Sequence, residues 1–352
     1  MIALLTILGT AHAEDLLLVG NSYTFANDLE QRTREMFISG ASRGNIASTW
    51  AGGATQRLAD GGLLFKDHIL RAQTNGSPWQ TALAKPEAHW DWIVFQEQSQ
   101  IAGFPEEQAD VTQSRTSAAG LDDLAEARGA QTVWLLTWGR RDGDSTNRDR
   151  YPDYRTMQDY LTEGYLAYRD GTSTESRPTW IAPAGPAFGI VHDDLLAAGS
   201  DPLVAGSRFV KLYVEDGSHP SAHGSYLAAC VIYSTVTGDT CVGLPAPANV
   251  PAEDVAWLQD ASWRAVNDPA LGLTYPWTPP PDTGGSDTAL DTASDTGASD
   301  TGATDTSNDT SDASGKDEAG CGCATGGQQV PSLGVVAALA WLVGRRRRAP
   351  QA

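Results

Sequence analysis

The chain has 352 residues, of which 41% are hydrophobic and 19% charged, and 44 acidic side chains against 24 basic ones give a formal net charge of −20. This acidic balance disfavours binding to nucleic acid, because the phosphate groups would be repelled. Residues 14–276 show no break in composition and are enough for one large core, so they are predicted to form one domain.

The first 13 residues are predicted to be a signal peptide, with Glu14 as the first mature residue. Met1 to Ala13 is apolar and ends in small residues that fit a cleavage site. The stretch is short and carries no basic residue ahead of its apolar run, so a start codon further upstream is one interpretation. A first strand with a ragged beginning is the other.

A strand-to-helix turn is predicted around Ser22. The apolar run Leu16–Val19 predicts a buried strand, and apolar residues recur at helical spacing over Phe25–Ile38. Between them stands Gly20-Asn21-Ser22-Tyr23-Thr24. Backbone N–H groups at the start of such a helix lack partners and would stabilise an anion at the serine oxygen. The alternative is that Ser22 only caps the helix.

Short apolar runs alternate with amphipathic stretches along the rest of the domain. Strands that alternate with helices favour a parallel sheet covered on both faces, so the predicted fold is a three-layer α/β/α sandwich with a flavodoxin-like sheet. In such sheets the functional crevice lies beyond the carboxyl ends of the strands. The expected strands are 16–19, 46–50, 92–96, 132–137 and 179–183, and the expected helices include 63–72, 121–128 and 154–168.

Two further strand ends carry groups that can donate hydrogen bonds. Gly52 and Gly53 follow the expected second strand, where a glycine can bring its backbone N–H close to a substrate oxygen. Gln96 and Gln98 follow the third strand and offer side-chain amides. One of these glycine N–H groups and one of these amides would form, with the N–H of Ser22, an oxyanion hole of three donors. Alternatively, the glycines form a turn and the glutamines are surface residues.

A second candidate segment reads Asp216-Gly217-Ser218-His219-Pro220. Three residues separate the carboxylate from the imidazole, so one loop can bring them together. Their contact would fix the histidine tautomer and leave its other ring nitrogen to take a proton from Ser22. The alternative is an ordinary turn followed by a capped helix.

The end of the chain indicates export. Residues 277–319 are rich in Asp, Thr, Ser and Gly and are predicted to be a flexible acidic linker. Residues 320–348 contain Cys321 and Cys323, an apolar run at 330–343 and four arginines. The run is short for a membrane span but can act as a stop-transfer element, with the arginines at the cytoplasmic face.

This order of cysteine, apolar helix and basic end resembles the C-terminal sorting signals of myxobacterial-type surface proteins. The resemblance implies that a sorting protease processes the tail near Cys321 and Cys323, or that the tail is lipidated there, and that the protein is displayed on the cell envelope. A simple membrane anchor is the alternative. In an exported protein Cys230 and Cys241, eleven residues apart, are expected to form a disulfide rather than two buried thiols.

Eleven tryptophans suggest an affinity for carbohydrate. Three of them lie near predicted strand ends or loops, where their rings could stack on sugars, and three others are predicted to belong to the core. The first group is Trp50, Trp79 and Trp138, and the second is Trp90, Trp92 and Trp134.

Four blocks between Leu16 and Gly238 resemble, in order, the SGNH hydrolase superfamily of GDSL-type esterases, in the branch whose first block reads Gly-Asn-Ser-Tyr-Thr. The resemblance implies a Ser–His–Asp triad of Ser22, His219 and Asp216, and no cofactor or metal. It also implies an oxyanion hole of Ser22, Gly53 and Gln98. The third block departs from the pattern, because Gln96-Glu97-Gln98-Ser99 stands where Gly-x-Asn-Asp is usual.

These features predict an exported, surface-anchored serine ester hydrolase that acts on acylated carbohydrate, for example by removing acetyl groups from a polysaccharide. The alternative function is a non-catalytic surface protein that binds a glycan or a protein partner on the same fold.

Overall fold

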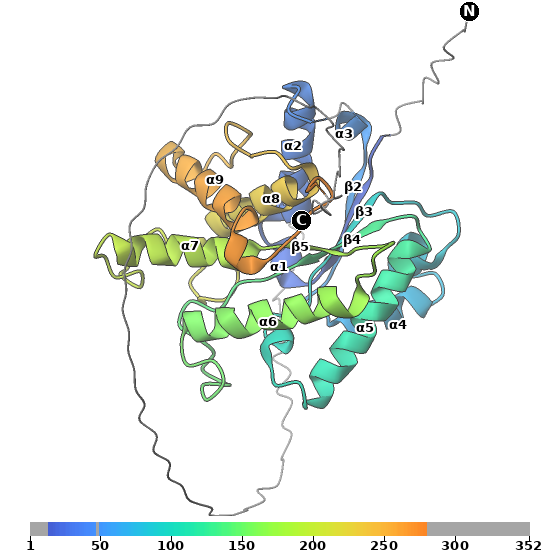
Figure 1. The fold of residues 1–352 in the computed structure, drawn as a ribbon, viewed down its shortest axis with the longest axis horizontal. Helices are drawn as coiled ribbons and strands as arrows, with labels where there is room; N and C mark the ends of the chain where they lie inside the picture. The colour runs from blue at the N-terminus through green and yellow to red at the C-terminus, as the bar shows by residue number, and fades with distance from the viewer. Residues whose placement is uncertain (1–12, 47–48, 280–352) are drawn as a thin grey trace, which may run out of the picture. The chain divides into compact units, whose positions relative to one another are not determined.

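Five parallel strands form a sheet in the order β2-β1-β3-β4-β5 (Figure 1). The computed structural model describes residues 13–46 and 49–279. The strand order is that of a flavodoxin-like sheet, so the predicted fold class is confirmed. The strands are β1 (Leu16–Gly20), β2 (Thr55–Ala59), β3 (Trp92–Phe95), β4 (Gln131–Leu135) and β5 (Trp180–Ala182).

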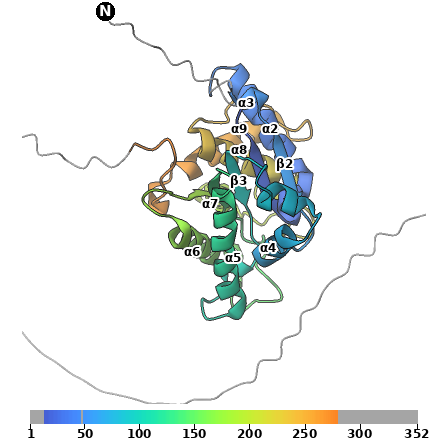
Figure 2. The same ribbon diagram turned by 90° about the vertical axis from the view of Figure 1, so that its right-hand side faces the viewer.

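Helices cover both faces of the sheet. Successive side chains of a strand point to opposite faces, and in β1 both sets are apolar and buried. Leu16 and Leu18 of β1 belong to one buried cluster, and Leu17 and Val19 belong to another. The first cluster is covered by α2 (Leu29–Ser42), α7 (Ala184–Ala197), α8 (Ala222–Thr237) and α9 (Ala252–Val266). The second is covered by α4 (Phe65–Gln73), α5 (Ala109–Glu126) and α6 (Tyr154–Thr172), as Figures 1 and 2 show.

Four of the five expected strands lie within two residues of their predicted bounds, but the second does not. In place of a strand at 46–50, the structure has the short helix α3 (Thr49–Gly52), and the second strand is Thr55–Ala59. This strand lies at the edge of the sheet, pairs with β1 alone among the described residues, and buries only Leu58 of its own five. An edge strand tolerates polar residues, so Thr-Gln-Arg-Leu-Ala has no apolar run to predict it.

The helix expected at 25–38 is divided in two. The one-turn helix α1 (Ser22–Phe25) is followed by η1 (Ala26–Asp28), where Asn27 and Asp28 have φ values of 52° and 54°, and only then by α2. The remaining short elements are η2 (Gln80–Ala84), η3 (Ile101–Gly103), η4 (Val210–Leu212) and η5 (Pro269–Leu271).

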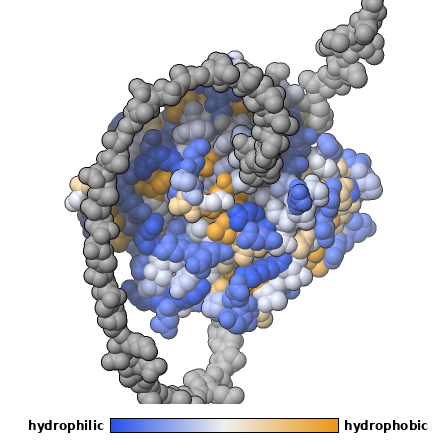
Figure 3. All heavy atoms as spheres, in the orientation of Figure 1, coloured by the Kyte–Doolittle hydropathy of each residue, from blue (hydrophilic) through white to orange (hydrophobic). Residues whose placement is uncertain are grey.

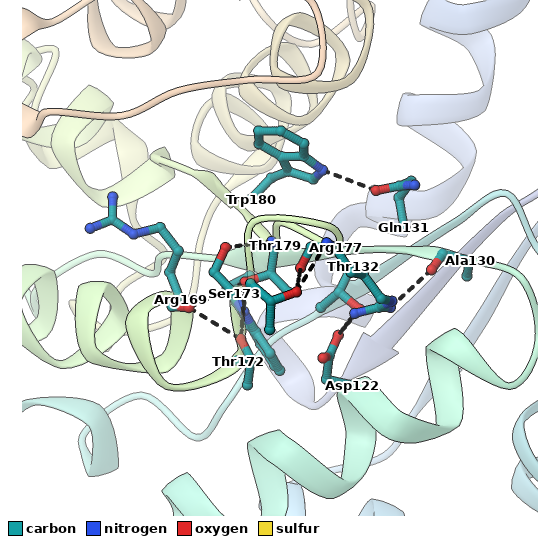
Figure 4. A network of polar contacts seen from close by, with 12 residues as sticks. Asp122, Ala130, Gln131, Thr132, Arg169, Thr172, Ser173, Arg177, Thr179 and Trp180 are labelled. Atoms are coloured by element: carbon teal, nitrogen blue, oxygen red, sulfur yellow. Dashed lines mark hydrogen bonds and ion pairs between the residues drawn. The ribbon is translucent and has the colours of Figure 1, made fainter. Parts of the chain in front are cut away.

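A partly buried polar network joins the amino ends of β4 and β5 (Figure 4). Arg177 binds the carboxylate of Asp122 at 2.5 Å through Nη1, and its Nη2 donates to the carbonyl of Ala130 at 3.1 Å. Thr132 also donates to Asp122, at 2.6 Å. This network ties α5 and the start of β4 to the segment that precedes β5.

Buried side chains include the three tryptophans expected to stack on sugars. Trp50 and Trp79 are 8% exposed and Trp138 is fully buried, so the expectation of exposed rings at these positions is wrong. Trp90, Trp92 and Trp134 are also buried, as predicted. On the face that Figure 3 shows, hydrophilic residues predominate and hydrophobic ones form small groups among them.

Cys230 on α8 and Cys241 beyond its end form a disulfide. None of the helices in the described part of the chain has the length and apolarity needed to cross a bilayer. Most of the predicted signal peptide, nearly all of the linker, and the tail with Cys321 and Cys323 lie outside the described residues.

Candidate active site

Ser22 is the first residue of α1, just beyond the carboxyl end of β1. Asn21 fixes this turn on three sides. Its side-chain oxygen accepts from the N–H of Tyr23 at 3.2 Å, its amide donates to the carbonyl of Leu63 at 3.1 Å, and its backbone N–H donates to Gln96 Oε1 at 3.0 Å. The turn is therefore held by the segments that follow both neighbouring strands.

Gly20 leaves room for the side chains that pack beneath this turn. A Cβ at that position would lie 2.1 Å from the hydroxyl oxygen of Thr24 and 2.7 Å from Gln96 Oε1. Both atoms are hydrogen-bonded to each other beneath the turn, at 2.9 Å. A larger residue would displace the Thr24 and Gln96 side chains and break this hydrogen bond.

The structure brings Ser22, His219 and Asp216 together in a chain of hydrogen bonds. His219 Nε2 lies 2.8 Å from Ser22 Oγ, and His219 Nδ1 lies 2.7 Å from Asp216 Oδ2. Because Asp216 binds Nδ1, the proton on the neutral ring belongs there, and Nε2 is free to accept the proton of the serine hydroxyl.

The segment Asp216–Pro220, which we call the acid–base loop, is arranged around the Asp216 carboxylate. Oδ1 accepts from the backbone N–H groups of Ser218 at 2.8 Å and His219 at 2.9 Å. Partial burial raises the pKa of Asp216, but the two N–H groups and the His219 ring outweigh it, so this pKa lies below its usual range. The carboxylate therefore stays charged opposite the imidazole.

The histidine and aspartate are accessible from solvent. The side chain of His219 is 40% exposed and that of Asp216 is 48% exposed, while Ser22 is half-buried. A bulky molecule can therefore reach both side chains.

Gly53 lies at the wrong end of the sheet for the predicted oxyanion hole. A Cβ on Gly53 would meet the carbonyl oxygen of Glu14 at 1.6 Å, and the next residue, Ala54, accepts from the N–H of Leu16. Glu14 precedes β1, whereas Ser22 follows it, and a strand of five residues is about 17 Å long. The predictions for Gly53 and for its neighbour Gly52 depended on the misplaced second strand, and the placement beside Ser22 is wrong.

The two glutamines after β3 have different surroundings from those expected. Gln96 is buried, and its Oε1 accepts from Asn21 while its Nε2 donates to the carbonyl of Glu97. Both partners are unambiguous, so the amide orientation is set and Nε2 is occupied. Gln98 donates through Nε2 to Gln100 Oε1 at 3.0 Å. Among the described residues neither amide is hydrogen-bonded to Ser22, and the role of Gln98 as third donor stays a prediction.

A glycine pair that the sequence interpretation passed over does lie at the correct edge. Gly61 and Gly62 follow β2, whose last residue, Ala59, is in register with Gly20. The adjoining Leu63 is bound by the side chain of Asn21. The available signal was a Gly-Gly pair after a short polar strand. Because that strand has no apolar run, it was not predicted, and neither was the role of the glycines. The backbone N–H of Ser22 itself has no hydrogen-bond partner among the described residues.

Glu97 is a fully buried carboxyl beneath the same edge. Its Oε1 accepts from the N–H groups of Phe65 at 3.0 Å and Gln98 at 2.7 Å, and Ser114 donates to Oε2. Burial raises the pKa of Glu97 to about 7, although these hydrogen bonds oppose the shift. The residue links the start of α4 to the segment after β3 and does not contact the triad.

The fold and these contacts define an α/β protein with a Ser–His–Asp hydrogen-bond chain at the carboxyl edge of its sheet. The chain is similar to a DUF4886 family protein from Bacteroides uniformis, with 17% identity, a TM-score of 0.53, and 73% of this chain and 95% of that one covered. This TM-score shows a shared fold.

Two further solved structures resemble the chain less closely in shape. One is a protein named as a candidate SGNH hydrolase from Slackia heliotrinireducens, with 26% identity, a TM-score of 0.45, and 64% and 99% of the two chains covered. The other is an acetylxylan esterase from Geobacillus stearothermophilus, with 13% identity, a TM-score of 0.41, and 66% and 96% covered. No protein-family model and no curated protein matches the chain.

Proposed function

We propose that this protein is a serine ester hydrolase of the SGNH type that removes small acyl groups, such as acetyl, from carbohydrate. One observation carries the proposal: Ser22, His219 and Asp216, from segments almost two hundred residues apart, form one hydrogen-bond chain at the edge where α/β sheets bind their ligands. The motifs quoted above and the shared fold support the same reaction class.

The proposed reaction has two steps. His219 Nε2 takes the proton of Ser22 as Oγ attacks the acyl carbonyl, and the proton then passes to the alcohol that leaves. In the second step a water molecule gives its proton to His219 and attacks the acyl-enzyme, so that the acid is released and Ser22 is restored. Asp216 stabilises the imidazolium that forms in each step.

The negative oxygen of each tetrahedral intermediate needs hydrogen-bond donors. We assign the first to the unpartnered N–H of Ser22 and the second to the N–H of Gly62, in place of Gly53, because the neighbouring Gly61 N–H already donates to Asp60 Oδ1 at 2.8 Å. The accessible histidine and aspartate support an acyl group carried on a polymer, because neither is enclosed in a narrow pocket.

A direct test compares the purified full-length protein with Ser22→Ala. The wild-type protein should hydrolyse p-nitrophenyl acetate and acetylated xylan oligomers, and Ser22→Ala should lose both activities. The alternative is a non-catalytic glycan-binding protein. It is supported by the amides of Gln96 and Gln98, which in the described residues donate to acceptors other than Ser22. A fluorophosphonate probe separates the two functions, because it should label Ser22 only in an enzyme.

We further propose that the protein is exported and held at the cell envelope by its C-terminal tail. The Cys230–Cys241 disulfide supports an oxidising compartment. An antibody against the domain should then label intact cells that express the full chain, and deletion of residues 320–352 should release the protein into the medium. Labelling only after lysis would contradict export.

A further inference from the structure

The helix α1, which carries Ser22, contacts the acid–base loop through a residue outside the triad. Tyr23, which follows Ser22, is buried, and its hydroxyl lies 2.7 Å from the hydroxyl oxygen of Ser218. Its ring meets His219 edge-on, with centroids 5.5 Å apart and an interplanar angle of 72°. Ser218 lies between Asp216 and His219 in sequence, so Tyr23 is hydrogen-bonded to the middle of the loop.

Trp138, beyond the end of β4, binds the same loop residue from its backbone side. Its indole N–H donates to the carbonyl of Ser218 at 3.1 Å. The indole is stacked between two parallel rings, that of Tyr23 at 4.8 Å and that of Phe188 at 4.5 Å. A fully buried stack of this kind cannot shift without repacking the core, so the hydroxyl and the carbonyl of Ser218 are both held by rigid partners.

Asn27 holds the far end of the loop. Its side-chain amide donates to the carbonyl of Pro220 at 2.9 Å and to the hydroxyl of Ser225 at 3.3 Å. Asn27 and Asp28 both have left-handed backbone conformations, which are unfavourable for most residues and are adopted most readily by glycine, asparagine and aspartate. From this left-handed turn the Asn27 amide reaches the loop.

We propose that Tyr23, Trp138 and Asn27 are positioning residues that keep His219 Nε2 within reach of Ser22 Oγ. His219 and Asp216 are too exposed for packing to fix their side chains, so the loop that carries them must be fixed instead. Tyr23 and Asn27 come from the same segment as the nucleophile, so movement of that segment carries the base with it. This inference rests on the proposed esterase chemistry.

The first test is Tyr23→Phe, which removes the hydroxyl and keeps the ring. We expect kcat for p-nitrophenyl acetate to fall roughly 10- to 100-fold, because a small misplacement of the base is costly, while KM and the thermal midpoint stay nearly unchanged. The matched control is Tyr275→Phe, because the buried Tyr275 hydroxyl has no hydrogen-bond partner among the described residues. Equal kcat values for both variants would overturn the role of Tyr23.

A second measurement asks whether Tyr23 acts through His219. In a His219→Ala background only a residual rate remains, and Tyr23→Phe should not lower it further, since the residue it positions is absent. A merely structural role would lower the residual rate by the same factor as in the wild-type background. That outcome would contradict positioning.

Trp138→Phe and two Asn27 variants extend the test to the other contacts. Trp138→Phe should lower kcat, and Trp92→Phe is its control, since the Trp92 indole binds Glu14 at the opposite end of the sheet. Asn27→Gly relieves the left-handed backbone, whereas Asn27→Ala does not, but both remove the amide. Both should lower kcat similarly. Full activity in Asn27→Gly would mean that only the backbone conformation matters and would overturn the role of Asn27.

The inference can fail separately from the proposed function. If the wild-type protein hydrolyses no ester, the function fails, but the proton on His219 Nδ1 still reports on the loop by NMR. Its resonance should shift or broaden in Tyr23→Phe and stay unchanged in Tyr275→Phe. An unchanged resonance in Tyr23→Phe would reject the positioning role whatever the activity.

Discussion

The two ends of the sheet carry polar networks of similar chemistry but opposite character. At the amino end Asp122 and Arg177 have side chains that are 11% and 18% exposed, whereas at the carboxyl end Asp216 and His219 are 48% and 40% exposed. The first network joins structural elements and each member has a partner within it (Figure 4). The second ends at a serine hydroxyl that can react. We therefore expect loss of stability from one end and loss of activity from the other.

The largest effect is expected at the carboxyl end. Asp216→Asn should lower kcat by about 10³- to 10⁴-fold, because the amide favours the wrong histidine tautomer and does not stabilise the imidazolium. Urea unfolding should change little, since the site is exposed. Asp170→Asn, which removes an exposed acid paired with Arg169, is the control and should keep full activity. A comparable loss of stability in Asp216→Asn would break the contrast between the two ends.

Asp122→Ala should have the reverse effect. It leaves the partly buried Arg177 guanidinium without its carboxylate and should lower the free energy of unfolding by about 3 kcal/mol, measured by urea denaturation. The kcat of the folded protein should not change. Glu106→Ala is the matched control: its pair with Arg115 is exposed, so the loss should stay within about 1 kcal/mol. Reduced kcat in folded Asp122→Ala would show that the two networks are coupled.

Gly53→Ala tests the corrected position of the predicted oxyanion glycine. Because its Cβ would collide with the carbonyl of Glu14, the variant should lose about 2 kcal/mol of stability, with kcat unchanged in the folded fraction. A selective fall in kcat with normal stability would instead favour the position beside Ser22.

Glu97 lies near the carboxyl edge of the sheet but is buried, so it tests whether burial or the end of the sheet decides the role of a carboxyl group. Its pKa is about 7 in the folded protein and higher than in the unfolded chain, so folding favours the protonated form. Stability should therefore be greatest at acidic pH and fall by about 2 kcal/mol between pH 5 and pH 7.5. Glu97→Gln resembles the protonated form and should flatten this part of the urea-midpoint profile. An unaltered profile would assign the pH dependence to other groups.

Much of the fold could be predicted because its signals are local. The central strands β1, β3 and β4 are buried on both faces and read as apolar runs, so their positions follow from the sequence. The edge strand β2 has solvent beside it and is not an apolar run. The second strand was therefore predicted at the nearest apolar run, residues 46–50. Gly53 followed that error, and Gly61 and Gly62 were overlooked for the same reason.

The sequence by itself selected Ser22, Asp216 and His219, because a strand-to-turn boundary and a spacing of three residues are visible in a few neighbouring letters. Only the tertiary structure decided which residues hold them together. Tyr23 and Ser218 are 195 residues apart, and Trp138 reaches Ser218 from a third segment. Such contacts depend on how strands are ordered and how buried rings stack, which no local pattern encodes.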